Sequence, residues 1–168
     1  MSAYSEDNPR AISSPMAQRV AAPSRRIIAR AALYLGALAV LVTSIDHIQQ
    51  YYGEDYSTVP TIGTLFFLNF VAAVVIAVGL VAPLGRIVGR YADTVRALFA
   101  VAGIGLAVLS LVALFISESS SGLFGFGESG YRQAIVIAII AEAAATVFLV
   151  TYLVVNGTGI RKIRAGSR

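Results

Sequence analysis

The chain has 168 residues, of which 57% are hydrophobic and 13% are charged, and its mean hydropathy is +0.77. A soluble domain of this length rarely has so apolar a composition, so the sequence favours an integral membrane protein. The net charge of +4 would suit nucleic acid, but the basic residues flank apolar runs, where membrane orientation explains them, and we expect no nucleic-acid partner.

Residues 1–24 are polar and rich in Ala, Ser and Pro, without an apolar period. This composition predicts a disordered cytoplasmic tail. Residues 25–160 form the predicted transmembrane domain, and residues 161–168 form a basic cytoplasmic tail. The domain contains four apolar runs of bilayer-spanning length, at about 27–48, 62–83, 97–117 and 133–155.

The basic residues are distributed unevenly between the connections. The chain up to Arg30, the connection after the second run and the C-terminal tail hold 12 of the 13 Lys and Arg residues, and the other two loops hold only Arg132. The positive-inside rule therefore predicts a multi-pass protein of the cell membrane with both termini in the cytoplasm. The basic tails would contact anionic lipid headgroups.

Backbone polar groups in lipid must be satisfied within each segment, so the four spans are expected to be helices. The short connections predict an all-α membrane protein, an antiparallel up-down bundle of four transmembrane helices. Beyond the lipid bilayer, the expected partners are further copies in a homo-oligomer or the subunits of a larger membrane complex.

Glu142 lies in the middle of the fourth span, close to the midplane of a hydrocarbon core about 30 Å thick. An acidic residue there costs on the order of 2.5–3.5 kcal/mol on insertion. Small residues share its helix face, namely Ala134, Ala138, Ala141, Ala145 and Thr146. Small residues allow close helix approach in membranes, so we expect the carboxyl group to face the interior of the bundle.

Two other spans carry polar residues along one face. The first has Gly36, Val40, Thr43, Ser44 and His47, and the second has Asn69 with Ala72, Ala73 and Ala77. One interpretation is a small polar pocket or proton relay formed by Glu142, Asn69, His47, Thr146 and Ser44. The other is that these groups only tie helices together by hydrogen bonds.

Several kinds of chemistry are disfavoured by composition. The chain has one His and no Cys, which excludes bis-His haem ligation, disulfides and thiol chemistry and disfavours zinc. A Ser-His-Asp site has no nucleophile elbow here. We therefore expect no catalytic residues, no metal and no cofactor.

The loop before the fourth span contains Gly125, Gly127 and Gly130, which match G-x-G-x-x-G. That pattern binds dinucleotides only within a soluble βαβ unit, so the match is read as chance. The glycines would allow Phe124 and Phe126, with Arg132 beside them, to fold over the bundle mouth as a lid; a merely flexible loop is the alternative.

Two stretches carry a resemblance: HIQQYYGEDYSTVPTIGTLFFLN at 47–69 and LFGFGESGYRQAIVIAIIAE at 123–142. Together they resemble uncharacterised small four-span membrane proteins of actinobacteria. The resemblance implies a four-helix membrane protein and supplies no activity.

Three functional hypotheses follow from these patterns. The leading one is non-enzymatic: an accessory or binding component with an outward-facing polar pocket. The second is a proton-coupled transporter or channel component that acts as an oligomer. The third is a membrane enzyme acting on a lipid-soluble substrate.

Overall fold

The computed structural model describes residues 15–118 and 133–166, and the side chains of residues 24–118 and 133–157. All regular elements in these ranges are helical, and four helices are long and apolar enough to cross a membrane, as expected from the sequence. The long helices are α1 (Pro15–Gly53), α2 (Ile62–Val81), α4 (Ala92–Ser117) and α5 (Gln133–Gly166). Short elements join them: η1 (Tyr56–Thr58), α3 (Leu84–Ile87) and η2 (Gly89–Tyr91).

The helices extend beyond some of the predicted spans. Helix α1 begins at Pro15, inside the tail expected to be disordered, and α5 continues to Gly166, inside the basic tail. The apolar run marks the part of a helix that suits lipid and does not mark where the helix ends. The flank of α1 is rich in Ala and Arg, which are good helix formers, whereas α5 continues through Asn156, Gly157 and Thr158, which are not. Proline is accepted at the first helical position, where α1 starts. The predictions for residues 1–14 lie outside the described residues.

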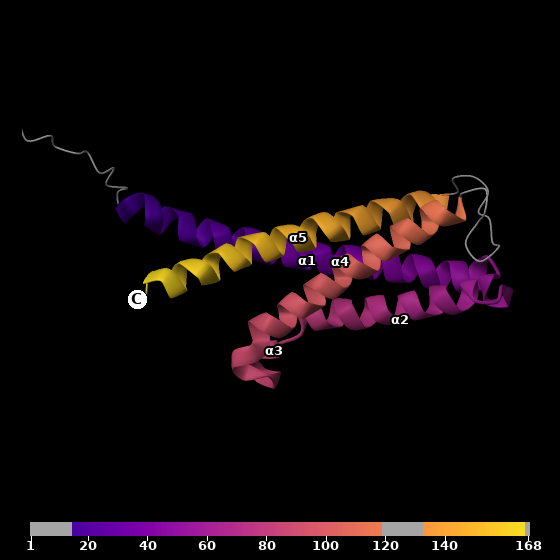
Figure 1. Cartoon of the computed structure of the whole chain (residues 1–168), viewed down its shortest axis with the longest axis horizontal. Helices are drawn as coiled ribbons and strands as arrows, with labels where there is room; N and C mark the ends of the chain where they lie inside the picture. The colour runs from indigo at the N-terminus through magenta and orange to yellow at the C-terminus, as the bar shows by residue number, and fades with distance from the viewer. Residues whose placement is uncertain (1–14, 119–132, 167–168) are drawn as a thin grey trace, which may run out of the picture.

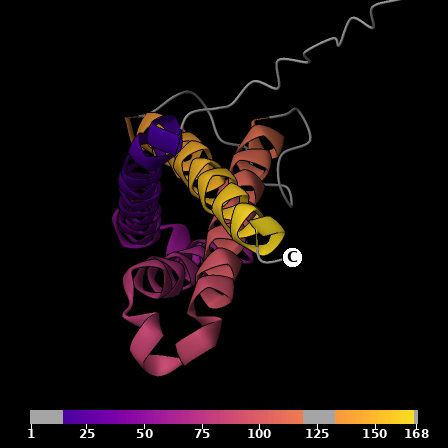
Figure 2. The same ribbon diagram turned by 90° about the vertical axis from the view of Figure 1, so that its left-hand side faces the viewer.

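The four long helices run lengthwise through the molecule, and all four reach the end opposite α3 (Figure 1). Helix α1 makes its most extensive contacts with α5 and α2, and α4 contacts α5 and α2. Helices α2 and α4 meet at the α3 end and diverge toward the opposite end, with α1 behind the gap in this view. The orthogonal view shows α5 crossing obliquely between α1 and α4, with α2 below them (Figure 2).

The buried faces agree with the faces expected from the sequence. Gly36, Val40, Thr43, Ser44 and His47 of α1 are all buried. On α5 the buried residues include Ala138, Ala141, Glu142 and Ala145. The opposite faces of all four helices carry exposed large apolar side chains, including Leu38, Val75, Leu109 and Val147.

Leu149 of α5 fixes the closest approach of the helices, because it lies between two glycines. A Cβ added at Gly36 of α1 would lie 2.6 Å from Leu149 Cδ2, and one at Gly103 of α4 would lie 2.8 Å from Leu149 Cδ1. Ile76 of α2 is 3.3 Å from the same Gly103 position. Leu149 is completely buried, so side chains and backbone from all four long helices fill this level of the core.

Arg96 closes the connection between α2 and α4. Its guanidinium group donates to the carbonyl oxygens of Leu80 (Nε to O, 3.3 Å) and Ala82 (Nη2 to O, 3.2 Å) at the end of α2. The last carbonyls of a helix have no partner within the helix, and a cation there also suits the helix dipole. Arg96 thus ties the start of α4 to the end of α2, and α2 and α4 diverge at the other end.

Candidate functional site

Four polar side chains, one from each long helix, lie at a similar depth from the end of the bundle opposite α3. Asp46, Asn69 and Ser110 are each seven residues from the nearest helix terminus at that end, and Glu142 is nine residues from the start of α5. At about 1.5 Å per residue these positions correspond to depths of about 10–14 Å. We call Asp46, Asn69, Ser110 and Glu142 the polar layer.

Ser110 joins three helices through hydrogen bonds. Asn69 Nδ2 of α2 donates to the Ser110 hydroxyl of α4. The Ser110 oxygen accepts this bond, so the Ser110 hydroxyl hydrogen is available to another acceptor. The Ser110 side chain forms its second hydrogen bond with the Glu142 carboxyl group of α5. Glu142 has only 1% of its surface exposed, and Ser110 is its hydrogen-bond donor in this layer.

Asp46 brings a second carboxyl group close to Glu142. Asp46 is buried, and its Oδ2 accepts a 2.6 Å hydrogen bond from Gln50 Nε2, one turn further along α1. The two carboxyl groups are near enough for the charge of Asp46 to act on Glu142. Two acidic groups in one buried layer leave a surplus of hydrogen-bond acceptors.

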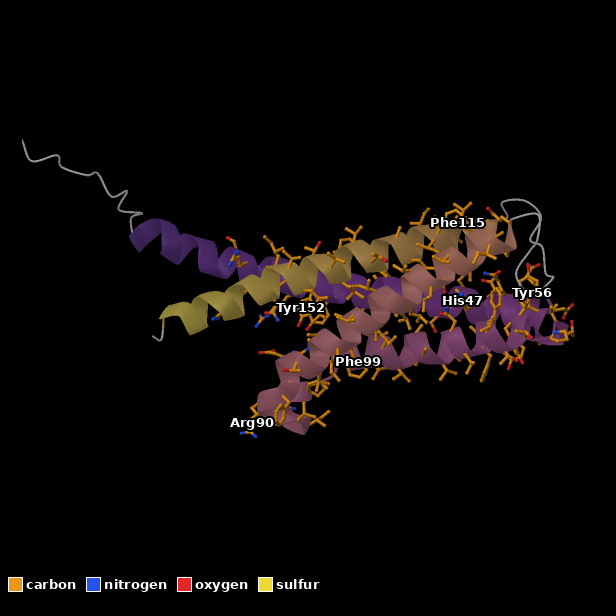
Figure 3. The ribbon with its side chains drawn as sticks, viewed as in Figure 1. His47, Tyr56, Arg90, Phe99, Phe115 and Tyr152 are labelled. Atoms are coloured by element: carbon orange, nitrogen blue, oxygen red, sulfur yellow. The ribbon has the colours of Figure 1, made fainter. Side chains whose placement is uncertain are left out.

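His47 lies beside this layer and has a defined tautomer. Its Nδ1 is 2.9 Å from the carbonyl oxygen of Thr43, one turn earlier on α1. A carbonyl oxygen only accepts, so Nδ1 carries the hydrogen and Nε2 of the neutral ring is an acceptor. The ring packs on Phe66 of α2, with centroids 5.1 Å apart. Figure 3 shows His47 in the gap between α2 and α4, far from Arg90.

A cavity of about 420 Å³ opens beside the polar layer. Its polar lining consists of His47, Gln50, Asn69, Ser110, Ser117 and Glu142. Its walls are apolar side chains of α2 and α4, such as Leu65, Leu68 and Leu109, with Ile135 and Ala138 from α5. Leu68 and Leu109 have 56% and 68% of their surfaces exposed, so the cavity reaches the outside of the bundle between α2 and α4.

The structure brings together three of the five predicted polar residues. Glu142, Asn69 and His47 all line the cavity. Ser44 instead donates to the carbonyl oxygen of Phe70 (3.3 Å), which ties α1 to α2, and Thr146 donates to the carbonyl oxygen of Glu142 on its own helix (2.9 Å). Neither Ser44 nor Thr146 lines the cavity. The suggested lid residues Phe124, Phe126 and Arg132 lie outside the described residues.

Sequence reasoning missed Ser110 and Gln50. Ser110 is a hydroxyl residue within the apolar run of α4, and such a residue was a detectable signal because polar side chains in a span tend to find partners on other helices. Gln50 lies beyond the predicted end of the first span near residue 48, in what was expected to be a loop. Helix α1 in fact continues to Gly53 and places Gln50 one turn after Asp46.

The described residues contain no group of three or more His, Cys, Asp or Glu side chains that could hold a metal ion. The cavity does offer unused acceptors. Asn69 Oδ1 is buried without a hydrogen-bond partner, and His47 Nε2 is an acceptor by its tautomer. The arrangement can therefore bind a molecule that donates hydrogen bonds.

No protein-family model, no curated protein and no solved structure matches this chain. The resemblance to actinobacterial four-span proteins therefore stays a prediction.

Proposed function

We propose that this chain is a multi-pass protein of the cell membrane, an antiparallel up-down bundle with both termini in the cytoplasm. Its role is non-enzymatic: it is an accessory or binding component that holds a lipid-soluble molecule in the cavity beside the polar layer. The cavity, with the buried Glu142 in its lining, is the observation that carries this proposal.

The exposed surface supports a bilayer environment. Each of the four long helices contains an 18-residue stretch of high mean hydropathy, and large apolar side chains cover their outer faces. A soluble monomer rarely exposes so much contiguous apolar surface. In a bilayer the same faces would contact lipid chains, and the helical backbone would satisfy its own polar groups.

The position of the basic residues supports the orientation. Arg86, Arg90 and Arg96 belong to the α2–α4 connection, at the end of the molecule where α1 starts and α5 finishes (Figure 1). The cavity lies in the opposite half. With the basic end in the cytoplasm, the cavity would open in the outer half of the membrane, as the positive-inside rule implies.

The form of the cavity favours binding of a lipid-soluble molecule. Small-molecule sites usually have volumes of roughly 300–1,000 Å³, mostly apolar walls and a few placed polar groups. This cavity has that volume and that lining, and its walls are exposed on the side that would face lipid. A ligand could therefore enter sideways from the bilayer and orient its polar end toward Glu142.

Native mass spectrometry of the full chain, purified in mild detergent, tests the proposal. We expect a stoichiometric lipid-soluble molecule on the parent and its loss in Ala113→Trp, which fills the cavity. The matched control is Ala144→Trp, in a separate apolar groove between α1 and α5, which should retain it. A parent that carries no molecule, or equal binding by both variants, would contradict the proposal.

A proton-coupled carrier is the second candidate, because buried carboxyl groups in membranes commonly mark ion or proton pathways. Asp46 and Glu142 are the observation in its favour. Reconstitution in liposomes separates the two roles: a carrier would show pH-dependent flux that Glu142→Ala abolishes. A binding component would show no flux in either protein.

A further inference from the structure

Three polar atoms of the cavity are acceptors that no group of the described residues uses. Asn69 Oδ1 is buried without a hydrogen-bond partner, His47 Nε2 is an acceptor by its tautomer, and Ser110 donates to only one oxygen of the Glu142 carboxyl group. The Ser110 hydroxyl donates to Glu142 and accepts from Asn69, so its donor is used within the layer. Gln50 Nε2 donates one of its two N–H groups to Asp46. A ligand that brings donors would satisfy the three acceptors.

The charges around the cavity have one sign. Glu142 lines it and Asp46 lies behind Gln50 within electrostatic range of Glu142. Among the described residues, no Lys or Arg lines the cavity, and Arg90 lies at the opposite end of the molecule (Figure 3). A buried carboxylate is costly unless a positive charge accompanies it. A cationic donor would satisfy both the charge and the acceptors.

The apolar walls define the rest of the ligand. Leu65, Leu68 and Leu109 extend from the polar layer to the exposed outer face of α2 and α4. These two helices diverge away from α3 (Figure 1). An alkyl or polycyclic apolar body would lie between them, with its end in the lipid.

Resting on the proposed function, we propose that the cavity binds a lipophilic amine, with its ammonium group at Glu142 and Asn69 and its apolar body between α2 and α4. The ammonium N–H groups donate to the Glu142 carboxylate and to Asn69 Oδ1. The ligand thereby supplies a positive charge, because no Lys or Arg lines the cavity among the described residues.

Photolabelling of the full chain in lipid nanodiscs tests the proposal. One probe is a C12 alkyl amine with a diazirine near its tail, and the second is the matching C12 alcohol. We expect the amine to label the α2 and α4 walls saturably, with dodecylamine competing at least tenfold better than dodecanol. Charge-assisted hydrogen bonds are about twice as strong as neutral ones, and a tenfold difference corresponds to about 1.4 kcal/mol.

Glu142→Gln preserves the shape of the side chain and removes its charge. We expect this variant to lose at least tenfold in amine affinity while labelling by the alcohol probe persists, which also verifies its fold. Glu54→Gln, which neutralises an exposed carboxyl group outside the cavity, should label like the parent.

The outcomes separate this inference from the proposed function. Equal competition by amine and alcohol, or an unchanged amine affinity in Glu142→Gln, would overturn the amine assignment and leave a lipid-soluble ligand in the cavity. Labelling by the alcohol alone would do the same. If neither probe labels the α2 and α4 walls saturably, both the amine assignment and the binding function fail.

Discussion

Ser110 determines how the acid at position 142 is accommodated. A carboxyl group within an apolar helix is expensive unless hydrogen bonds accompany its burial. Ser110 provides one such bond and is itself held by Asn69. A single hydroxyl therefore connects α2, α4 and α5 at the level of the cavity.

Replacing this hydroxyl is the first stability test. We expect Ser110→Ala to destabilise the folded protein by about 1–2 kcal/mol, because it leaves the Asn69 amide and the Glu142 carboxyl unpaired. The measurement is reversible unfolding in mixed micelles. Ser117→Ala is the matched control on the same helix, since Ser117 donates only to the carbonyl of Leu114 in its own helix. A smaller loss for Ser110→Ala than for Ser117→Ala would disprove the bridging role.

At the scale of the helices, Leu149 and its two glycines set the spacing of α1, α4 and α5. Both methyl groups of Leu149 are confined, Cδ2 by Gly36 and Cδ1 by Gly103. The leucine cannot move away from one glycine without approaching the other.

Gly103 and Gly105 provide a matched pair on α4. An added methyl group at Gly103 meets Leu149 and Ile76, whereas one at Gly105 meets nothing within 4 Å. Both changes to Ala gain the same helix propensity, about 1 kcal/mol. We expect Gly103→Ala to be less stable than Gly105→Ala by about 1–3 kcal/mol, the usual penalty of overpacking. Equal unfolding midpoints would refute the close contact.

Arg96 is the corresponding element-scale contact at the α3 end. Arg96→Met keeps much of the side-chain length but removes the two hydrogen bonds to the carbonyls of Leu80 and Ala82. We expect a loss of about 1–2 kcal/mol on unfolding. Arg90→Met, at an exposed arginine that stacks on Tyr91, should change stability little. Comparable losses in the two variants would mean that Arg96 does not secure the end of α2.

At the scale of the whole molecule, basic residues and the cavity lie in opposite halves. Arg86, Arg90 and Arg96 of the α2–α4 connection lie at one end, and the cavity with Glu142 in its lining lies in the other half. In the orientation that we propose, the cavity would lie toward the outer leaflet.

Orientation can be tested with single cysteines, because the chain has none of its own. Ser57 and Ser24 are both exposed, Ser57 within η1 and Ser24 on α1 before the first apolar run. In intact cells we expect a membrane-impermeant maleimide to label Ser57→Cys, and to label Ser24→Cys only after lysis. The reverse pattern would invert the orientation, and labelling of both in intact cells would contradict an odd number of crossings between them.

The sequence by itself determined the helices and their inward faces. Hydropathy identified four helices of membrane-spanning length, and the small residues around Glu142 indicated its buried side, because both signals depend only on the order of residues along one helix. Hydropathy did not locate the ends of α1 and α5, since polar flanks can remain helical.

Only the tertiary structure decided which polar groups meet. The partnership of Ser110 with Asn69 and Glu142 depends on the vertical offset between α2, α4 and α5, and the periodicity of one helix contains no information on that offset. The cavity likewise lies where α2 and α4 diverge, beyond the Arg96 and Leu149 contacts between helices. The distances between helices are set by packing, and packing involves residues that are far apart in the chain.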